Sequence, residues 1–267
     1  MEQRITHRWQ WVGYAYPLAI LGYLLLAWYT CYKVDFLQQP SALFPWSQAL
    51  MDEGHTPMLW LVLFGEASLT ENLQWFSLLL AAFFSGLVAV QSKQARLAAV
   101  ILCFGLLWMY AEDCYNVRHL TSAWLGEAWL GYDTASLEWR RSRARTMIEL
   151  AIYAGMAAAM AVAYWLVWSR KLLSRPAFII FTSGYVLYGI AAFGSASRNV
   201  GDWYANLGSK LFDTLALKHD IPWRGHDIVH FQDPLGFWWM DYILEESLEL
   251  MAASLLLTGI FFCIKRN

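Results

Sequence analysis

The residues with the clearest chemical potential are carboxylates in the stretch MDYILEESLELMAASLLL, close to the C-terminal end of the chain. Asp241, Glu245 and Glu249 are four residues apart and would share one face of a helix, with Glu246 one position round. An acid one or two turns inside a membrane helix costs on the order of 2–3 kcal/mol, so it must face the bundle or water and find a partner. The cluster therefore indicates either structural ion pairs with arginines of neighbouring helices, or a site for a metal, a proton or a substrate.

Other segments carry polar groups that could reach the same level. The stretch WMYAEDCYNVRH places Glu112, Asp113 and His119 at the end of an apolar run, and Glu149 lies one turn inside the next run. If successive helices alternate in direction, these groups and the C-terminal acids converge at one depth. The stretch SASRNVGDWY adds candidates for substrate binding or ion pairing, which together with two acids of the C-terminal cluster are Arg198, Asn199, Asp202, Asp241 and Glu246.

Histidines give a second indication of a metal site. The motif HDIVH spaces His226 and His230 as i and i+4, which is a metal-ligand spacing if the segment is helical, whereas the alternative is an amphipathic surface loop. The candidate ligands are Glu112, Asp113, His119, Glu149, His226, His230, Glu245 and Glu249. A mixed set of histidines and carboxylates suits Zn²⁺, Fe or Mn better than Cu(I). Such a metal would activate water or oxygen, and the candidate catalytic carboxylates are Glu112, Asp113, Glu245 and Glu249.

The elements that must position these groups are membrane helices. Hydrophobic residues make up 58% of the 267 residues and charged residues only 15%, against roughly 25% charged in an average soluble domain. The apolar residues form runs of about 20, which at ~1.5 Å rise per residue cross ~30 Å of hydrocarbon. We therefore predict one all-α domain, residues 1–267, that is a polytopic transmembrane helix bundle with short interfacial helices in its external loops. The six predicted spans are residues 12–32, 73–91, 97–115, 146–168, 177–195 and 237–264.

Two features of these spans bear on the topology. The segment Pro57–Ala67 is too short to cross, so we expect an interfacial or re-entrant helix, and a seventh span only if it enters the membrane. The first run is long enough to span and lacks a small-residue cleavage pattern, so we expect a retained helix and no cleavable signal peptide.

The fourth span carries a stripe of small residues, which allows close helix packing and could form the face of a homo-oligomer. The stripe is Ala151, Gly155, Ala159 and Ala163.

Basic residues predict the orientation. Lys and Arg gather in the two terminal segments and in the loops QSKQAR and SRKLLSR, which predicts that both termini lie in the cytoplasm. An arginine cluster before the fourth span falls on the opposite, external side, where long loops tolerate basic residues. This cluster is Arg140, Arg141, Arg143 and Arg145.

Composition and missing motifs exclude several classes of protein. The net charge of −2 gives no basic field, so no nucleic-acid partner is expected, and without a P-loop or a cytoplasmic domain no nucleotide is expected. The four cysteines form no CxxC pair, which argues against a thiol-disulfide enzyme. The lipid bilayer is the expected partner, together with a second membrane protein or a second copy of the chain.

The stretches AEDCYNVRH and EESLELMAASLLL resemble a group of uncharacterised bacterial multipass inner-membrane proteins. Members of that group have an acidic pair followed by His or Glu on one helix, and a Glu-Glu-x-x-Glu start to the last helix. The chain departs from the pattern at His119, where no Glu follows. The resemblance implies a bacterial inner-membrane protein and carries no activity. Membrane hydrolases of the alkaline ceramidase type bind zinc through His and Asp near one membrane face, but His226 and His230 lie outside the last span, so the chain is not assigned there.

Three functions remain open from the sequence. The first is a metal-dependent membrane enzyme that acts on a lipid or another membrane-soluble substrate. The second is a non-catalytic subunit or assembly factor of a larger membrane complex, in which buried ion pairs fix the helices. The third is a cation- or proton-coupled transporter, although no ionisable residue continues the path from the acidic cluster towards the cytoplasm.

Overall fold

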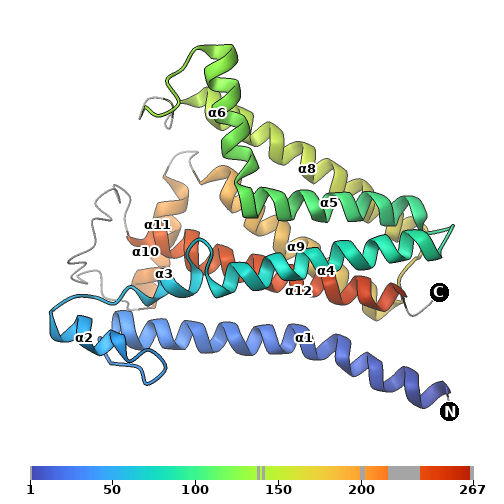
Figure 1. Ribbon diagram of the computed structural model, residues 1–267, viewed down its shortest axis with the longest axis horizontal. Coiled ribbons are helices and arrows are strands. Elements are labelled where there is room, and N and C mark those ends of the chain that lie inside the picture. The colour runs from blue at the N-terminus through green and yellow to red at the C-terminus, as the bar shows by residue number, and fades with distance from the viewer. Residues whose placement is uncertain (1, 137–138, 140–141, 199–201, 216–234, 265–267) are drawn as a thin grey trace.

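The computed structural model is a bundle of long helices (Figure 1). It describes residues 2–136, 139, 142–198, 202–215 and 235–264, and every regular element within these ranges is helical. The elements are α1 (Glu2–Cys31), the π-helical turn η1 (Tyr32–Phe36), α2 (Trp46–Asp52), α3 (Leu59–Phe64), α4 (Leu69–Gln91), α5 (Arg96–Tyr115), α6 (Val117–Leu130), α8 (Arg143–Ser169), α9 (Arg175–Ser197), α10 (Trp203–Thr214), α11 (Leu235–Trp238), the π-helical turn η2 (Trp239–Glu245) and α12 (Glu246–Ile264). The helical fold predicted from hydropathy is confirmed.

Five helical segments of the described chain are long and apolar enough to cross a membrane. They are Gly13–Phe36, Leu59–Gln91, Arg96–Tyr115, Arg143–Ser169 and Arg175–Ser197. Each overlaps one of the first five predicted spans. The structure is therefore compatible with the membrane protein that the sequence predicts. The sixth predicted span, residues 237–264, is also helical and runs through η2 and α12. That this helix crosses the membrane stays a prediction.

The segment Pro57–Ala67 contains α3, which is packed inside the protein. Leu59 and Phe64 are fully buried. The carboxylate of Asp35 accepts hydrogen bonds from the backbone N–H groups of Leu59, at 2.8 Å, and Trp60, at 2.9 Å. Asp35 is itself fully buried and satisfies the first backbone donors of α3, whose Leu59 and Trp60 are also buried. This cap explains how so short a helix is held in place.

The second candidate membrane segment, Leu59–Gln91, begins before the predicted span 73–91. The structure joins α3 and α4 into one apolar stretch of 33 residues, because Ser68 and Glu71 cap α4 across the break. Ser68 accepts a hydrogen bond from the N–H of Glu71, and the Glu71 carboxylate accepts one from the N–H of Ala67. The prediction stopped short because the acids around this break interrupt the hydropathy run.

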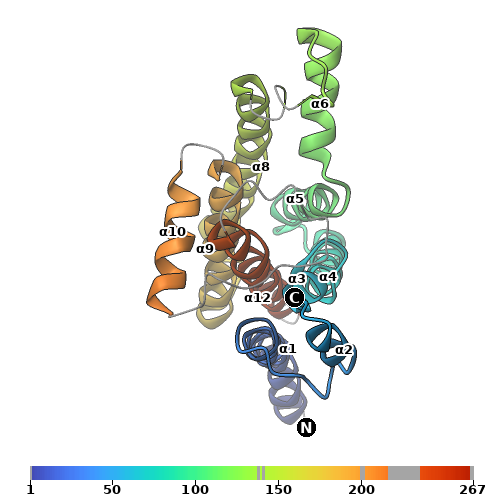
Figure 2. The same ribbon diagram turned by 90° about the vertical axis from the view of Figure 1, so that its left-hand side faces the viewer.

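Helix α12 is the centre of the bundle and contacts α9, α4 and α1 (Figures 1 and 2). Its approach to α9 is close because glycines stand at the crossing. A Cβ at Gly184 would lie 2.9 Å from the backbone nitrogen of Leu256, and a Cβ at Gly259 would lie 2.8 Å from the Cβ of Phe181. Small residues of this kind bring membrane helices into backbone contact.

The two ends of the bundle differ in chemistry. Figure 1 shows the start of α1 and the end of α12 at the same end of the molecule. The half of the bundle towards this end is filled by apolar side chains of α4, α5, α8, α9 and α12, among them Leu78, Leu102, Phe181 and Leu256. We call the opposite end, where α5 ends and α12 begins, the polar end. Helix α6 projects from it (Figures 1 and 2).

Most of the stripe of small residues on α8 does not mediate packing within the chain. Ala163 is fully buried, but Ala151, Gly155 and Ala159 are exposed. The physical reason is that α8 packs against α5 through Met160 and Leu166, which lie on another face of the helix. A homo-oligomer built on the exposed part of the stripe stays a prediction.

Candidate functional site

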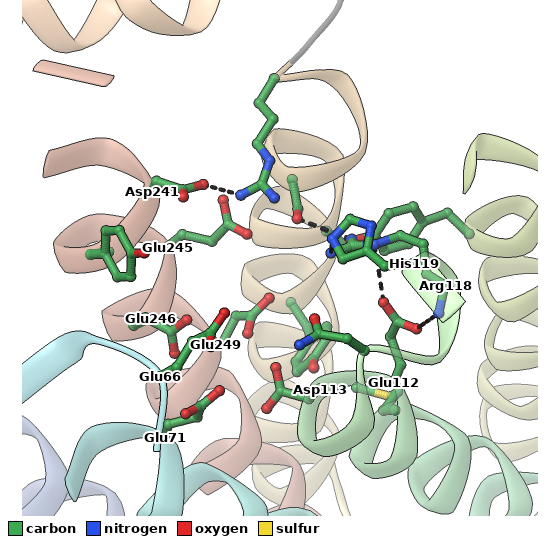
Figure 3. A pocket seen from close by; sticks show the side chains of 18 of the residues that line it. Glu66, Glu71, Glu112, Asp113, Arg118, His119, Asp241, Glu245, Glu246 and Glu249 are labelled. Atoms are coloured by element: carbon green, nitrogen blue, oxygen red, sulfur yellow. Dashed lines mark hydrogen bonds and ion pairs between the residues drawn. The ribbon is translucent and has the colours of Figure 1, made fainter. Parts of the chain in front are cut away.

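A polar cavity lies among the helices at the polar end (Figure 3). Its volume is about 470 Å³, which is in the range of pockets that bind small molecules rather than a single ion. Its walls come from α4, α5, α6, α8, α9 and the continuous helix of α11, η2 and α12. The charged residues and the histidine that line it are Glu66, Glu71, Glu112, Asp113, Arg118, His119, Arg145, Arg198, Asp241, Glu245, Glu246 and Glu249.

The structure brings most of the predicted site residues together. Asp241, Glu245 and Glu249 line one side of the cavity, as their spacing predicts, and Glu246 lines it as well. The π-helical turn η2 ends at Glu245, so two consecutive acids can face the same space. Asp202, by contrast, is exposed at the start of α10 and does not line the cavity. Three predicted site residues lie outside the described residues: Asn199, His226 and His230.

Glu112 is held in a buried ion pair with Arg118. The Nε of Arg118 lies 3.2 Å from Glu112 Oε1, and the backbone N–H of Arg118 donates to Glu112 Oε2 at 2.7 Å. The Arg118 guanidinium also lies over the ring of Tyr153, 4.8 Å from its centroid, and donates to Ser195. Burial lowers the pKa of Arg118 from its ordinary value. The negative charge of Glu112 raises this pKa, but by less than burial lowers it. The pair ties the end of α5 to the start of α6.

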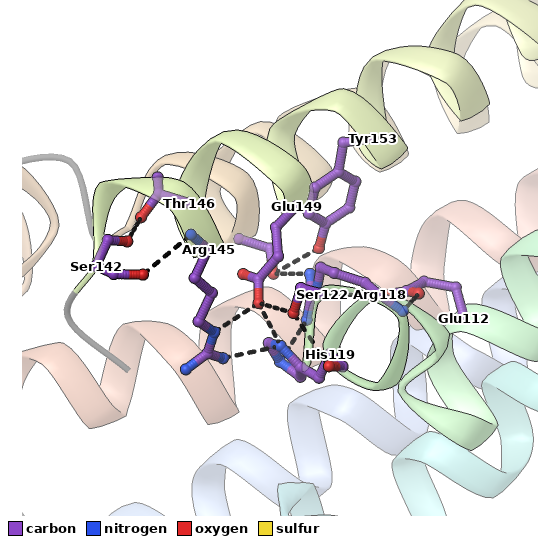
Figure 4. Close-up of polar contacts among 10 residues, drawn as sticks. Glu112, Arg118, His119, Ser122, Ser142, Arg145, Thr146, Glu149 and Tyr153 are labelled. Atoms are coloured by element: carbon purple, nitrogen blue, oxygen red, sulfur yellow. Dashed lines mark hydrogen bonds and ion pairs between the residues drawn. The ribbon is translucent and has the colours of Figure 1, made fainter. Parts of the chain in front are cut away.

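Glu149 and His119 belong to a second network, which joins α6 to α8 (Figure 4). Glu149 Oε1 lies 2.8 Å from His119 Nδ1 and accepts hydrogen bonds from Arg145 Nε, at 2.7 Å, and from the hydroxyl of Ser122, at 3.2 Å. The Glu149 carboxylate is therefore occupied by its neighbours. In this arrangement Glu149 positions α6 against α8.

Arg198 forms the third ion pair, with Asp241. It joins the end of α9 to η2 across the mouth of the cavity. Burial alone lowers the pKa of Arg198, but the charges of Asp241 and Glu245 raise it by more, so the net shift is upward. All three arginines of the cavity are thus paired with a carboxylate.

Six carboxylates that line the cavity form no ion pair with a basic side chain among the described residues. They are Glu66, Glu71, Asp113, Glu245, Glu246 and Glu249. We call them the unpaired carboxylates. They lie on the side of the cavity formed by α4, α5 and α12, and Figure 3 shows their side chains turned towards a common space.

Neutral side-chain donors hold three of the unpaired carboxylates, in addition to the backbone N–H that Glu71 accepts from. Gln74 is fully buried, and its Nε2 donates to Asp113 Oδ2 and to Glu249 Oε2, at 2.8 Å each. Trp75 Nε1 donates to the same oxygen of Asp113 at 2.7 Å, and the hydroxyl of Tyr204 donates to Glu245 at 2.8 Å. The amide of Gln74 therefore bridges two acids that come from different helices.

Sequence reasoning missed part of this site. Gln74 lies in an apolar run and Tyr204 lies far from the acids in sequence, so only the fold shows what they contact. Glu66 and Glu71 lie before residue 73, where the predicted second span begins. Helix α4 begins earlier, at Leu69, so these two acids were not recognised as part of the site. Arg118 had a signal, because it lies within the quoted stretch AEDCYNVRH and is the first basic residue after the two acids.

The predicted metal ligands are not gathered into one coordination sphere. Within the described residues, no three side chains of His, Cys, Asp or Glu are close enough to hold a metal ion. Glu112, His119 and Glu149 are engaged in the two ion-pair networks instead. A Zn²⁺, Fe or Mn ion stays a prediction.

An apolar groove adjoins the cavity between α8 and α9. Its volume is about 490 Å³, and it is lined by small and apolar side chains, among them Ala154, Ala157 and Phe193. Helix α8 packs mainly on α5 and α9 mainly on α12, so the two diverge and leave the groove between them. The groove and the cavity share five wall residues: Met109, Tyr153, Met156, Tyr188 and Ala192.

No family model matches the chain, and comparisons with curated proteins and with solved structures found no match either. The geometry of the cavity and the groove is therefore the basis for a proposed function.

Proposed function

We propose that the chain is a membrane enzyme that acts on the polar end of a lipid-soluble substrate, with the cavity as its site. The observation that carries the proposal is the set of six unpaired carboxylates, beside three arginines that already have partners. Acids retained only to fix helix packing would be matched by cations, because an unmatched acid inside a membrane bundle is costly. A surplus of acids in a cavity is typical of a site whose chemistry needs them.

Asp113 and Glu249 are the best candidates for the reacting groups. Gln74 holds the two carboxylates beside each other, and both line the cavity. A carboxylate pair can supply a general base, which takes a proton from an attacking water or hydroxyl, and a general acid, which returns a proton to the leaving group. Glu112 has a different role in this proposal, since its ion pair with Arg118 positions the end of α5.

A divalent transition metal remains compatible with this proposal. Bound in the cavity, Zn²⁺, Fe or Mn would act as a Lewis acid. Asp113, Glu245 and Glu249 would supply oxygen ligands, after side-chain movement that brings their oxygens together.

The adjoining groove supports a substrate that comes from the membrane. It lies between two apolar helices and shares part of its wall with the cavity, so a molecule in the bilayer can reach the acids without crossing water. The transporter alternative has less support, because apolar side chains such as Leu102 and Leu256 fill the bundle between the cavity and the end that holds the termini.

A role as a subunit or assembly factor of a membrane complex is the second candidate. Helix α6 favours it, because this helix projects from the bundle and exposes Leu120, Trp124 and Trp129. In both cases we place the protein in an inner membrane with both termini in the cytoplasm. The basic terminal segments support this orientation, as does the position of α1 and α12 at one end of the bundle in Figure 1.

The experiment that tests the enzyme is a comparative analysis of membrane lipids in cells that produce the chain. We compare wild type with the double variant Asp113→Asn, Glu249→Gln and with Glu127→Gln, which removes an exposed carboxylate of α6 that does not line the cavity. We expect one lipid class to fall or rise with wild type and Glu127→Gln, and to be unchanged by the double variant. If no class changes although all three proteins are present in equal amounts, the enzyme proposal is wrong.

A further inference from the structure

The groove between α8 and α9 has the form of a site for one hydrocarbon chain. Ala154, Ala157 and Ala161 line it on α8, and Gly189 lines it on α9, where an added Cβ would meet no atom within 4 Å. Towards the termini it is closed by Tyr185, whose hydroxyl donates to a backbone oxygen of α8 at 3.2 Å. The wall residues of α8 run from Leu150 to Ala161, a helix length of roughly 17 Å.

The groove leads into the cavity at an amphipathic boundary. Tyr153 and Tyr188 line both spaces and have an apolar ring and a polar hydroxyl. The Tyr153 hydroxyl donates to Ser195 at 3.0 Å on the cavity side. A molecule that fills both spaces must therefore be an amphiphile, with its chain in the groove and its headgroup among the acids.

The charge of the cavity selects the headgroup. Its arginines are paired, so the net charge that a headgroup meets comes from the unpaired carboxylates. Among these, Glu246 has a buried Oε2 without a hydrogen-bond partner, although the residue lines the cavity. The rings of Trp238 and Tyr242 stack 5.7 Å apart in the same wall, and aromatic walls with acids are typical of sites for organic cations.

We infer that the groove and the cavity together bind a long-chain amphiphile with an amine headgroup, the ammonium lying among the unpaired carboxylates (Figure 3) and the chain between α8 and α9. This inference rests on the proposed function, because it names the class of molecule that the enzyme would act on. An ammonium supplies both the positive charge that these acids lack and the donor that Glu246 Oε2 lacks.

The inference is tested by photo-crosslinking of the full chain in phosphatidylcholine vesicles. The probe is hexadecylamine with a diazirine in its chain, and the matched probes are hexadecanol and hexadecanoic acid with the same diazirine. We expect the amine to label α8 and α9 wall residues about tenfold more than either matched probe, and unlabelled hexadecylamine to compete. Equal labelling by the three probes, or preference for the acid, overturns the amine headgroup.

Variants separate the two parts of the site. Ala192→Phe fills the junction of groove and cavity and Gly189→Phe fills the groove, so each should reduce amine labelling about tenfold. Gly155→Phe is the matched control, since a Cβ there also meets no atom within 4 Å but the residue lines neither space. Glu246→Gln should reduce the preference for amine over alcohol while labelling stays at the same residues. Unchanged labelling in both phenylalanine variants overturns the groove assignment.

This test is independent of turnover, so the two proposals can fail separately. If amine labelling is as expected but the lipid analysis shows no change that depends on Asp113 and Glu249, the binding site stands and the enzyme proposal fails. If a lipid class without an amine changes and the amine probe is not preferred, the enzyme proposal stands and the amine inference fails.

Discussion

Gln74 offers a quantitative test of the site, because it is fully buried and its Nε2 donates to two carboxylates at 2.8 Å. Gln74→Leu keeps a similar volume and removes both bonds. Each hydrogen bond to a charged group contributes about 1.5–3 kcal/mol, so the loss is about 3–6 kcal/mol. The substitution also removes Gln74 Oε1, which is buried without a partner and costs about 1–3 kcal/mol. From the midpoints of the two ranges, about 4.5 and about 2 kcal/mol, we expect a net destabilisation of about 2.5 kcal/mol.

The assay is thermal unfolding of the detergent-solubilised protein, where this loss corresponds to a fall in Tm of roughly 5–10 °C for a chain of this size. The matched control is Gln48→Leu. Gln48 also donates to an aspartate, Asp52, at 2.6 Å, but it lies exposed on α2, so its loss should change the Tm by no more than a degree or two. If Gln74→Leu and Gln48→Leu have the same effect, the described contacts of Gln74 do not hold the carboxylates and the site geometry is wrong.

Three further substitutions test the elements around the cavity. Asp35→Ala leaves two buried N–H donors of α3 without an acceptor, which should destabilise the protein by about 2–6 kcal/mol. Hydrogen exchange in residues 59–64 should then become faster, and unchanged exchange there would contradict the cap. Gly184→Leu should separate α9 from α12 and cost about 1–3 kcal/mol, measured as a lower Tm, whereas Gly155→Leu on the exposed face of α8 should be neutral. Arg118→Ala leaves Glu112 buried without its cation and should cost about 3–5 kcal/mol, seen as loss of the monodisperse protein; retention of a normal Tm would show that the pair is not buried.

The helices and the acidic face could be predicted from the sequence because both depend on local patterns. The spans follow from apolar runs, and the spacing of Asp241, Glu245 and Glu249 fixes their common face in any helix. Helix α4 begins at Leu69, before the predicted start at residue 73, because Ser68 and Glu71 cap it through hydrogen bonds that a hydropathy pattern does not reveal.

The partners of the acids could not be predicted from the sequence. Each partner depends on which helices, far apart in sequence, pack against each other. Glu112 and Asp113 are neighbours in the chain, yet one forms an ion pair with Arg118 and the other accepts from Gln74. In a helix, adjacent side chains point about 100° apart, so neighbouring acids meet different helices. The distinction between paired and unpaired carboxylates, on which the function depends, is therefore a property of the fold.

The decisive measurement is the Tm of Glu246→Gln, compared with that of wild type. If the unpaired carboxylates serve a substrate, they are unfavourable for folding. Removing the charge at Glu246, whose Oε2 has no hydrogen-bond partner, should therefore raise the Tm while amine binding falls. A Tm lowered to the extent expected for a broken buried ion pair, about 3–5 kcal/mol of lost stability, would show that Glu246 is structural and would contradict the account.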